Sequence, residues 1–261
     1  MFAHQRQVQI LTELRRTGAV RVSDLTDLLG VSDMTIRRDL EQLVTDGVAL
    51  KVHGGAVLAG QVAHEPGFAA KIGLEQSAKH AIAAHAATLI RPGAAVALSA
   101  GTTTWAMARP IVKIPGVTVV TNSTTVADAI ATLDPTNHVS VILTGGARTP
   151  SAALVGSVAD RTIATMHVDQ LFLGVHGMDE RAGFTTPNLA EAATDRALIA
   201  CAREVIVLAD SSKWGVVGLA DIAPLSAARM VITDDKLPPD ALRVLQEQVH
   251  AVVTVHAEKT T

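Results

Sequence analysis

The chain has 261 residues, of which 48% are apolar and 18% charged, and its formal net charge is −3 at pH 7. This composition suffices for a substantial core in one or two domains, and no apolar run nears a membrane-spanning length of about 20 residues. The single cysteine, Cys201, excludes an intrachain disulfide, and residues 1–6 lack the features of a signal peptide. We therefore expect a cytoplasmic protein without a membrane partner, in which overall charge alone does not favour nucleic-acid binding.

The amino-terminal part of the chain predicts short helices joined by a tight turn. Apolar residues at helical spacing indicate a helix over residues 5–16 and another over residues 22–29. Ser23 is placed to cap the second of these helices. Gly30 is placed to end it, because helices commonly stop at a residue with positive φ. A Gly-containing turn between two short helices is typical of a helix-turn-helix.

A third helix and a small hairpin follow this turn. Ser32 is placed to cap the helix, and Ile36, Leu40 and Leu43 repeat at a spacing that gives it one apolar face. An Asp-Gly turn then leads to a strand over residues 48–52, which a Gly-Gly pair closes. This combination predicts a winged helix-turn-helix.

The outward face of the third helix carries the candidate DNA contacts. On a helical wheel, Met34 and Arg38 point almost directly away from the apolar face. In helix-turn-helix proteins this helix lies in the major groove, where Arg binds guanine bidentately and Thr or Met contacts a thymine methyl group. The alternative is a surface helix whose arginines are only solvated, and the neighbouring turn and wing argue against it. The expected DNA-contacting residues are Ser32, Met34, Thr35, Arg37, Arg38, Gln42, Lys51 and His53.

Two motifs in this region resemble the DeoR family of bacterial repressors. The family pattern VS-x-x-TIRRDL stands at residues 31–40, and its HGGA pattern stands at residues 53–56. A departure is Lys51, where the family often has Arg, because Lys offers phosphate a point charge without the guanidinium fork. The resemblance implies that residues 1–57 form a domain that binds double-stranded operator DNA. Since these residues carry equal numbers of basic and acidic side chains, one copy should bind weakly, and we expect a homo-oligomer, a dimer or a tetramer.

The rest of the chain predicts a linker and a second domain. Residues 58–72 are expected to form the linker, and residues 73–261 the second domain. Helices and strands alternate there, which predicts an α/β fold with a mainly parallel sheet covered on both faces. Expected helices cover residues 77–90, 125–133 and a segment from residue 104, and expected strands cover residues 94–98, 117–120, 140–143, 170–175, 204–209 and 229–233.

Four polar turns follow strands of this second domain. They cover residues 99–104, 121–123, 144–146 and 210–213 and are rich in Gly or hydroxyl groups, with Lys213 in the last one. In open α/β sheets, ligands bind beyond the carboxyl ends of the strands, and a Gly-rich turn that opens a helix suits a phosphate. Each turn alone is also typical of an ordinary connection. Together they predict a small anionic ligand.

The second domain also resembles the DeoR family, whose sensor domain shares its fold with ribose-5-phosphate isomerase and binds sugar phosphates. Matching segments run through most of this half of the chain. A departure is Ser99-Ala100 before the first Gly, where an acidic residue and Ser are frequent, so the effector could differ from those of better-known members. The resemblance and the turns together give the expected effector-binding residues Gly101, Thr102, Thr103, Thr104, Asn122, Ser123, Gly145, Gly146, Asn188, Glu191 and Lys213.

Two alternative functions remain open at this point. One is a sugar-phosphate isomerase or deaminase, but isomerases of this fold carry the segment DGADE for proton transfer, and Leu173 and His176 stand here where carboxylates would be needed. The other is an architectural DNA-binding protein without a ligand. Ten scattered histidines without paired Cys or carboxylate at ligand spacing give no metal site, and no cofactor is expected.

The sequence thus favours a ligand-responsive repressor of a carbohydrate operon. A sugar phosphate would bind the DNA-free arrangement more tightly, and this linkage would lower operator affinity by the same coupling free energy, typically about 1–3 kcal/mol.

Overall fold

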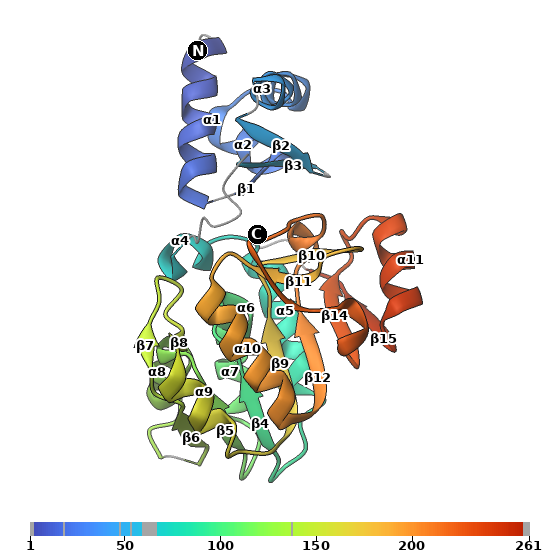
Figure 1. The fold of residues 1–261 in the computed structure, drawn as a ribbon. Coiled ribbons are helices and arrows are strands. Elements are labelled where there is room, and N and C mark those ends of the chain that lie inside the picture. The colour runs from blue at the N-terminus through green and yellow to red at the C-terminus, as the bar shows by residue number, and fades with distance from the viewer. Residues whose placement is uncertain are drawn as a thin grey trace. The chain divides into compact units, whose positions relative to one another are not determined.

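The computed structural model describes residues 3–17, 19–46, 48–52, 54–58, 67–136 and 138–257. Contacts between residues divide the chain into two units, Met1–Pro66 and Gly67–Thr261, which are drawn in Figure 1. The division lies inside the expected linker of residues 58–72. The last part of that range forms a short helix, α4 (Phe68–Ile72), which belongs to the second unit.

The first unit combines helices with a small antiparallel sheet, as expected for a winged helix-turn-helix. Its strand order is β1-β3-β2. Strand β1 was not predicted, because three residues are too short to display a period. It pairs with β3. This pairing requires glycine at residue 55, because a Cβ atom there would collide with the carbonyl oxygen of Val20. The elements are α1 (Ala3–Thr17), β1 (Ala19–Arg21), α2 (Val22–Leu29), α3 (Asp33–Thr45), β2 (Ala49–Val52) and β3 (Gly55–Leu58).

The core of the first unit confirms the predicted apolar face of α3. Ile36, Leu40 and Leu43 are all buried and join one cluster with residues of α1 and α2. Gly30 ends α2 with a φ of 63°, as predicted. The predicted cap of α2 was wrong, because the N-cap is Arg21 and Ser23 lies inside the helix. Strand β1 runs directly into α2, so its last residue already occupies the extended cap position.

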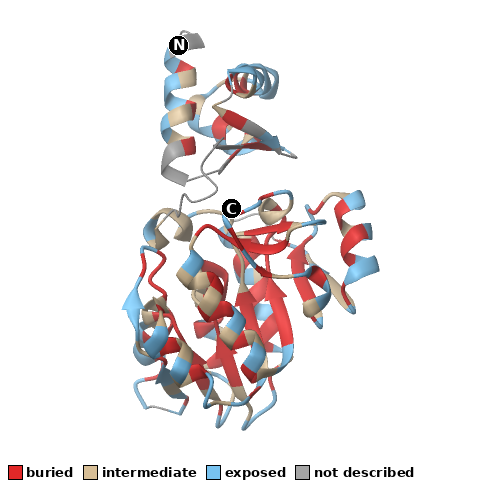
Figure 2. Ribbon diagram, viewed as in Figure 1, coloured by how far each residue is buried: buried red, intermediate tan, exposed pale blue. Residues whose placement is uncertain are grey.

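The second unit contains the predicted parallel sheet, with strand order β15-β14-β12-β9-β4-β5-β6. Side chains alternate along each strand, so that the sheet has two apolar faces. Val96, Phe172 and Ile206 join the cluster under α5 to α8, whereas Ala97, Leu171 and Val205 join the other one. Figure 2 shows the inner strands buried along most of their length, whereas the edge strands β6 and β15 are exposed or half-buried. The strands are β4 (Ala95–Leu98), β5 (Thr118–Thr121), β6 (Ser140–Leu143), β9 (Val168–Gly174), β12 (Ala202–Leu208), β14 (Met230–Asp234) and β15 (Ala251–Val255).

Helices cover both faces of this sheet, as the alternating pattern predicted. Residues of α9, α10 and α11 belong to one apolar cluster, and residues of α5, α6, α7 and α8 belong to the other. No helix in the described part of the chain is long and apolar enough to cross a membrane. The helices are α5 (Gln76–Ala87), α6 (Thr102–Ala106), α7 (Ala108–Ile111), α8 (Thr124–Leu133), α9 (Ser157–Ile163), α10 (Leu189–Cys201) and α11 (Pro239–Gln248), with short 3₁₀ turns η1 (Ser211–Lys213) and η2 (Leu225–Ala227).

Two small antiparallel sheets are formed by segments that connect strands of the main sheet. Strands β10 (Gly177–Asp179), β11 (Gly183–Thr186) and β13 (Ala220–Ala223) form one sheet, and β7 (Ala147–Arg148) pairs with β8 (Leu154–Val155). The first follows β9 and the second follows β6, so both belong to the carboxyl-end side of the parallel sheet.

Candidate DNA-binding and ligand-binding sites

The outward face of α3 is exposed, as the helical wheel predicted. Met34 is 74% exposed, and Arg37, Arg38 and Gln42 are also exposed. The three polar side chains differ in their partners. Arg37 lies 3.7 Å from the carboxylate of Asp33, and the Gln42 amide donates to Asp46. Within the described residues Arg38 has no hydrogen bond or ion pair, so its guanidinium is available to a partner.

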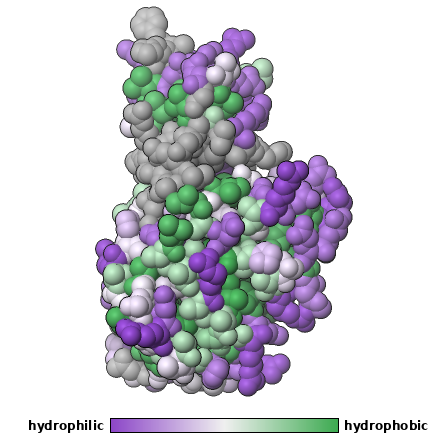
Figure 3. Space-filling model, in the orientation of Figure 1, coloured by the Kyte–Doolittle hydropathy of each residue, from purple (hydrophilic) through white to green (hydrophobic). Residues whose placement is uncertain are grey.

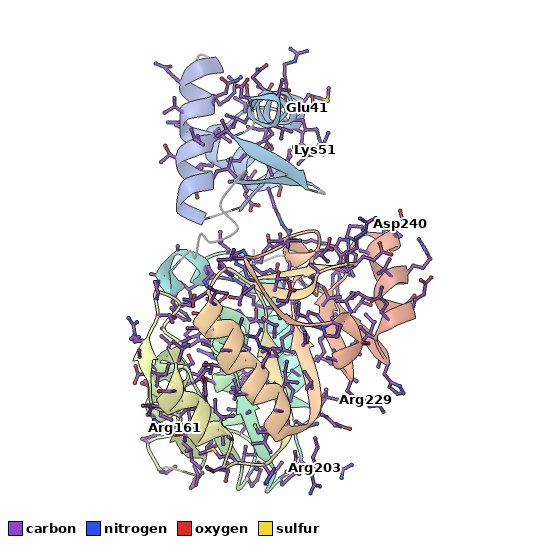
Figure 4. The ribbon with its side chains drawn as sticks, in the orientation of Figure 1. Glu41, Lys51, Arg161, Arg203, Arg229 and Asp240 are labelled. Atoms are coloured by element: carbon purple, nitrogen blue, oxygen red, sulfur yellow. The ribbon has the colours of Figure 1, made fainter. Side chains whose placement is uncertain are left out.

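The remaining predicted DNA contacts lie at the start of α3 and on the wing. Ser32 occupies the N-cap position of α3, and its hydroxyl shares a 2.9 Å hydrogen bond with that of Thr35 instead of capping the backbone. Lys51 of β2 lies 3.2 Å from Glu41 of α3, and Figure 4 shows the two side chains together. His53 lies outside the described residues. The wing is therefore tied to the outward face of α3 through an exposed ion pair.

A buried ion pair that the sequence reading missed fixes α3 against α1. The guanidinium of Arg6 donates to both oxygens of Asp39, at 2.5 Å and 3.1 Å, and both side chains are nearly buried. The hydrogen bond to Asp39 raises the pKa of Arg6. Asp39 is adjacent to Arg38 on the helix, so this planar pair sets the rotation of α3 and the direction of its outward face.

In the second unit, the order of the strands decides which polar turns meet. Strands β4 and β12 flank the central strand β9, β5 lies next to the edge, and β6 is the edge strand itself. At about 4.8 Å per strand, the ends of β6 and β12 are about 19 Å apart. We expected all four turns to lie around one ligand, and this expectation was wrong. The glycine turn after β6 is too far from the turn that carries Lys213.

Gly145 and Gly146 instead turn the chain into the β7–β8 hairpin. Gly145 has a φ of 73° and Gly146 a φ of 116°. A side chain on Gly146 would place its Cβ 2.5 Å from the Val155 carbonyl of β8. Both glycines are therefore required by the turn itself, and their predicted role in effector binding stays a prediction.

Several other predicted effector residues are occupied in holding the site's shape. Asn122 is 1% exposed, accepts from the backbone N–H of Ala100 and donates to the carbonyl of Leu154. Ser123 caps α8, Asn188 caps α10, and the Thr104 hydroxyl donates to the Gly101 carbonyl. These four side chains thus have partners within the protein, and their contact with an effector stays a prediction.

The hydroxyl groups of Thr102 and Thr103 remain available at this turn. Both residues are mostly buried, at 8% and 6% exposure, yet within the described part of the chain neither hydroxyl has a hydrogen-bond partner. Neither hydroxyl oxygen is fully enclosed by the protein, so both keep some exposed surface. The two hydroxyls, with the backbone that follows Gly101, therefore form the donor surface of this turn.

Three lysines gather beside this turn, and two of them lie outside the predicted site. We call Lys71, Lys79 and Lys213 the lysine cluster. Helix α5, which carries Lys79 in its first turn, leads into β4 and packs against α6. Lys79 is 4% exposed. Burial, followed by the charge of Lys213, lowers its pKa to about 8, and Lys71 acts in the same direction while Asp210 and Glu75 oppose it.

The hydrogen bonds of the cluster are unevenly distributed. Lys79 donates to the carbonyls of Lys71 and Leu74, at 2.8 Å and 2.5 Å. Lys71 donates to the hydroxyl of Ser151 at 2.8 Å. Lys213 is half-buried, and its ammonium has no hydrogen-bond partner within the described residues. The lysine cluster is therefore a candidate site for an anion, because the charges of Lys213 and Lys71 both disfavour that of the nearly buried Lys79.

A buried carboxylate holds the loop that carries Lys213. Asp234, at the end of β14, accepts from the Ser211 backbone N–H at 2.6 Å and from its hydroxyl at 3.0 Å. The Asp210 carboxylate accepts from the backbone N–H of Ser212. Lys213 therefore stands on a rigid turn, although its own side chain makes no hydrogen bond to the residues that the structure describes.

An acidic side chain of α10, Glu191, contacts the loop of residues 149–153. Glu191 accepts from the hydroxyls of Thr149 and Thr186, at 2.6 Å and 3.4 Å. Thr149 belongs to the loop of residues 149–153, which also carries Ser151, the partner of Lys71. One turn further along α10, burial and the neighbouring charge of Glu191 raise the pKa of Asp195 well above its usual range. The candidate site thus has a basic wall and an acidic one joined by this loop.

The segment that aligns with the isomerase motif forms a turn. The carboxylate of Asp179 accepts from the backbone N–H groups of Arg181 and Ala182, within the connection from β10 to β11.

Among the described residues, no three His, Cys, Asp or Glu side chains gather as a metal site would require. The labelled Arg203 and Arg229 stand at the amino ends of β12 and β14, the opposite edge from the lysine cluster (Figure 4).

Comparison with known proteins identifies the family of both units. Family models described as "DeoR-like helix-turn-helix domain" and "DeoR C terminal sensor domain" match residues 6–62 and 74–235. The uncharacterized helix-turn-helix regulator YgbI of Escherichia coli K12 is 37% identical over 95% of this chain and 96% of its own. A protein of Escherichia coli O157:H7, whose name assigns it provisionally to repression of the aga operon, is 36% identical over 96% of this chain and 93% of its own.

A more distant relative and a solved structure complete the comparison. The glycerol-3-phosphate regulon repressor of Escherichia coli K12 is 29% identical over 93% of this chain and 95% of its own. Ribose-5-phosphate isomerase A from Neisseria gonorrhoeae aligns with 54% of each chain at 12% identity and a TM-score of 0.39. That structural likeness is weak, and the relatives above carry the comparison.

Proposed function

Because this chain belongs to the DeoR family of transcriptional regulators, we propose that it represses a carbohydrate-metabolism operon and that a sugar phosphate modulates this repression. It binds operator DNA through α3 and the wing of β2 and β3. The effector binds at the carboxyl ends of β4 and β12. The observation that carries the effector assignment is the lysine cluster, in which one ammonium is nearly buried beside two others.

The DNA-binding unit reads the major groove with the exposed face of α3. Arg38 supplies the bidentate base contact, and Met34 and Thr35 approach a thymine methyl group. Arg37 and Lys51 have acidic neighbours, and they contact phosphate after exchanging those partners. Ser32, Gln42 and His53 complete the proposed contact set.

The effector binds with its phosphate toward the lysine cluster. Lys79 and Lys213 donate charge-assisted hydrogen bonds to the phosphate oxygens, and the hydroxyls of Thr102 and Thr103 add neutral donors. Glu191 accepts from sugar hydroxyls at the other wall. Two relatives carry names that refer to the aga operon and to the glycerol-3-phosphate regulon, which supports a phosphorylated carbohydrate as the ligand class.

The protein acts in the cytoplasm as a homo-oligomer, a dimer or a tetramer. Exposed apolar side chains on the second unit support self-association: Leu189 is 66% exposed, Leu219 48% and Val217 42%. Figure 3 shows apolar and near-neutral colour over much of the face of this unit that is turned to the viewer. Oligomerisation brings several DNA-binding units to one operator and raises their effective concentration.

The experiment joins selection of DNA with a ligand screen. The full chain selects a binding sequence from a random DNA library, and a panel of sugar phosphates is then tested for a saturable change in tryptophan fluorescence. Trp105 follows the Thr102–Thr103 turn and Trp214 follows Lys213, and no Tyr contributes background. One sugar phosphate is expected to change both the fluorescence and the affinity for the selected DNA.

The Lys213→Ala variant supplies the matched test of the site. It should lose much of its affinity for the phosphorylated sugar and little for the unphosphorylated one, because a charge-assisted hydrogen bond is about twice as strong as a neutral one. Equal binding of the confirmed effector by this variant and the parent contradicts the site. Turnover of the bound compound contradicts the regulatory function and supports the isomerase alternative.

A further inference from the structure

Helix α4 is the first element after residues 59–66, which connect the two units along the chain. None of its five residues is buried, so α4 contributes little to the core of the second unit. Its described contacts are instead with the elements that build the ligand site. The way in which α4 is held therefore depends on that site.

Three contacts of α4 involve site elements directly. The ring of Phe68 packs edge-on against Trp105 of α6, with 6.2 Å between the ring centroids. Its backbone N–H donates to the carbonyl of Pro150 at 3.2 Å. Lys71 donates to Ser151 at 2.8 Å. Helix α6 carries the two available threonine hydroxyls, and the loop with Pro150 and Ser151 also reaches Glu191.

The fourth contact comes from Lys79. Its ammonium has three N–H donors, and two of them bind the carbonyls of Lys71 and Leu74 at the end of α4. A cation at this position stabilises the carboxyl end of a helix. The ammonium that would bind an anion together with Lys213 is therefore also the group that holds the end of α4.

Without an anion, the positive charges of Lys71 and Lys213 both act against that of Lys79. A phosphate dianion placed among them converts this repulsion into attraction, because each ammonium then faces negative charge. We propose that anion binding at the lysine cluster closes α4 more firmly onto the second unit and so couples occupancy of the site to the segment that leads to the DNA-binding unit. This inference rests on the proposed function and adds its route of regulation.

Hydrogen exchange of the full chain tests the proposal, with inorganic phosphate as the probe. Saturating phosphate is expected to slow exchange severalfold in peptides that cover residues 67–75 and to leave α11 unchanged. Lys71→Met keeps Lys79 and Lys213, so it should still bind phosphate, severalfold more weakly, but lose the slowing. Lys113→Met is the matched control, because this exposed lysine precedes the amino end of β5, at the opposite edge of the sheet. It should behave like the parent.

The outcomes separate the two claims. Saturable binding of phosphate without slower exchange at residues 67–75 overturns the closure of α4 and leaves the proposed function standing. Retention of the slowing by Lys71→Met also overturns it. Absence of binding by the parent, with inorganic phosphate and with every sugar phosphate, overturns the proposed function and this inference together. If Lys71→Met fails to fold, Phe68→Ala serves instead: it should bind inorganic phosphate like the parent but lose the slowing at residues 67–75, and retained slowing overturns the closure.

Discussion

Two adjacent arginines on α3 have different surroundings, and the difference assigns them different tasks. Arg37 lies 3.7 Å from Asp33, one helical turn back, whereas Arg38 has no ion pair or hydrogen bond among the described residues. Bidentate recognition of guanine requires that both donor groups of the guanidinium point at one base edge. A neighbouring carboxylate competes for those donors, so Arg38 suits base readout and Arg37 suits phosphate.

Arg38→Ala is expected to weaken binding of the selected operator by about 1–3 kcal/mol and to relax the preference at one base pair. Stability should barely change, because the side chain is exposed. Operator and non-operator affinities are compared by titration at fixed salt. Arg37→Ala should weaken both affinities alike, and Arg91→Ala, an exposed arginine of the second unit, is the control for loss of charge. If Arg38→Ala binds the operator like the parent, the assumed face of α3 is wrong.

Lys79 shows how a binding group can lower the stability of the unit that contains it. Its pKa is about 8 in the folded protein, against 10.5 for an unperturbed lysine. Between these values the unfolded chain binds more protons than the folded one, so stability rises with pH across this interval. Below pH 8 the cost of the buried charge is fully present, and above pH 10.5 it is absent.

The predicted gain in stability between pH 8 and pH 10.5 is up to about 3 kcal/mol, from the change in pKa alone. Urea unfolding monitored by tryptophan fluorescence measures it for the second unit, because both tryptophans lie there. The parent is compared with Lys79→Met, in which the titrating group is absent and the rise should disappear. Parallel curves for the two proteins would show that Lys79 does not titrate as described. Saturating phosphate should also flatten the rise in the parent, since the bound anion favours the charged ammonium.

At the scale of the helix, two ion pairs connect α3 to the rest of its unit. Arg6 and Asp39 are nearly buried and joined by two hydrogen bonds, whereas Lys51 and Glu41 are both more than 60% exposed. Exposed pairs contribute little to stability, while removal of one partner of a buried pair leaves the other charge uncompensated. The orientation of α3 therefore depends on Asp39, although this residue faces away from the proposed DNA contacts.

Asp39→Ala is expected to lower the unfolding midpoint of the first unit by several degrees and to weaken operator binding severalfold. Far-ultraviolet circular dichroism follows unfolding, and the operator titration above follows binding. Glu41→Ala is the matched control, since it removes a carboxylate from the same helix whose partner, Lys51, is exposed and not buried. Equal effects of the two substitutions would contradict a special role for the buried pair.

The elements that the sequence predicted are those with a long apolar period. The helix at residues 77–90 and the predicted inner strands of the sheet were found because each is buried along at least one face. The edge strand β6, predicted at residues 140–143, is mostly exposed and was found from its apolar run alone. Strands β1, β7 and β8 have two or three residues, too few to display a period. Strand β15 was overlooked, although its run of Val after Ala251 has the composition of a strand.

The candidate site was predicted less completely, for two physical reasons. A turn motif does not reveal whether its polar atoms are already used, and Asn122 and Ser123 turned out to bind backbone groups. Strand order is also invisible in a single sequence, so the edge position of Gly145 and Gly146 could not be foreseen. Lys79 had a detectable pattern: it precedes Ile82, Ala83 and Ala86 at the spacing of the buried face of α5.

At the scale of the molecule, each unit has its own apolar core. One cluster includes Ile10, Leu25 and Leu40 of the first unit, and the two clusters of the second unit lie on opposite faces of its sheet. The first unit therefore has the means to fold alone. Its surface charge does not favour DNA, because basic and acidic residues are balanced in residues 1–57. Strong operator binding must then come from the number of units that engage DNA together.

A fragment of residues 1–66 is expected to fold and to bind the selected operator far more weakly than the full chain. In the proposed function the second unit supplies oligomerisation, and linkage of several modules can raise the overall affinity by about 10²–10⁴-fold through effective concentration alone. Sedimentation fixes the oligomeric state of both proteins, and titration at fixed salt compares their affinities. Fusion of the fragment to an unrelated dimeric protein should restore part of the affinity without any effector response, because the lysine cluster and α4 are absent from it. Full-strength binding by the isolated fragment as a monomer contradicts the avidity argument, since one such unit would then suffice for the operator.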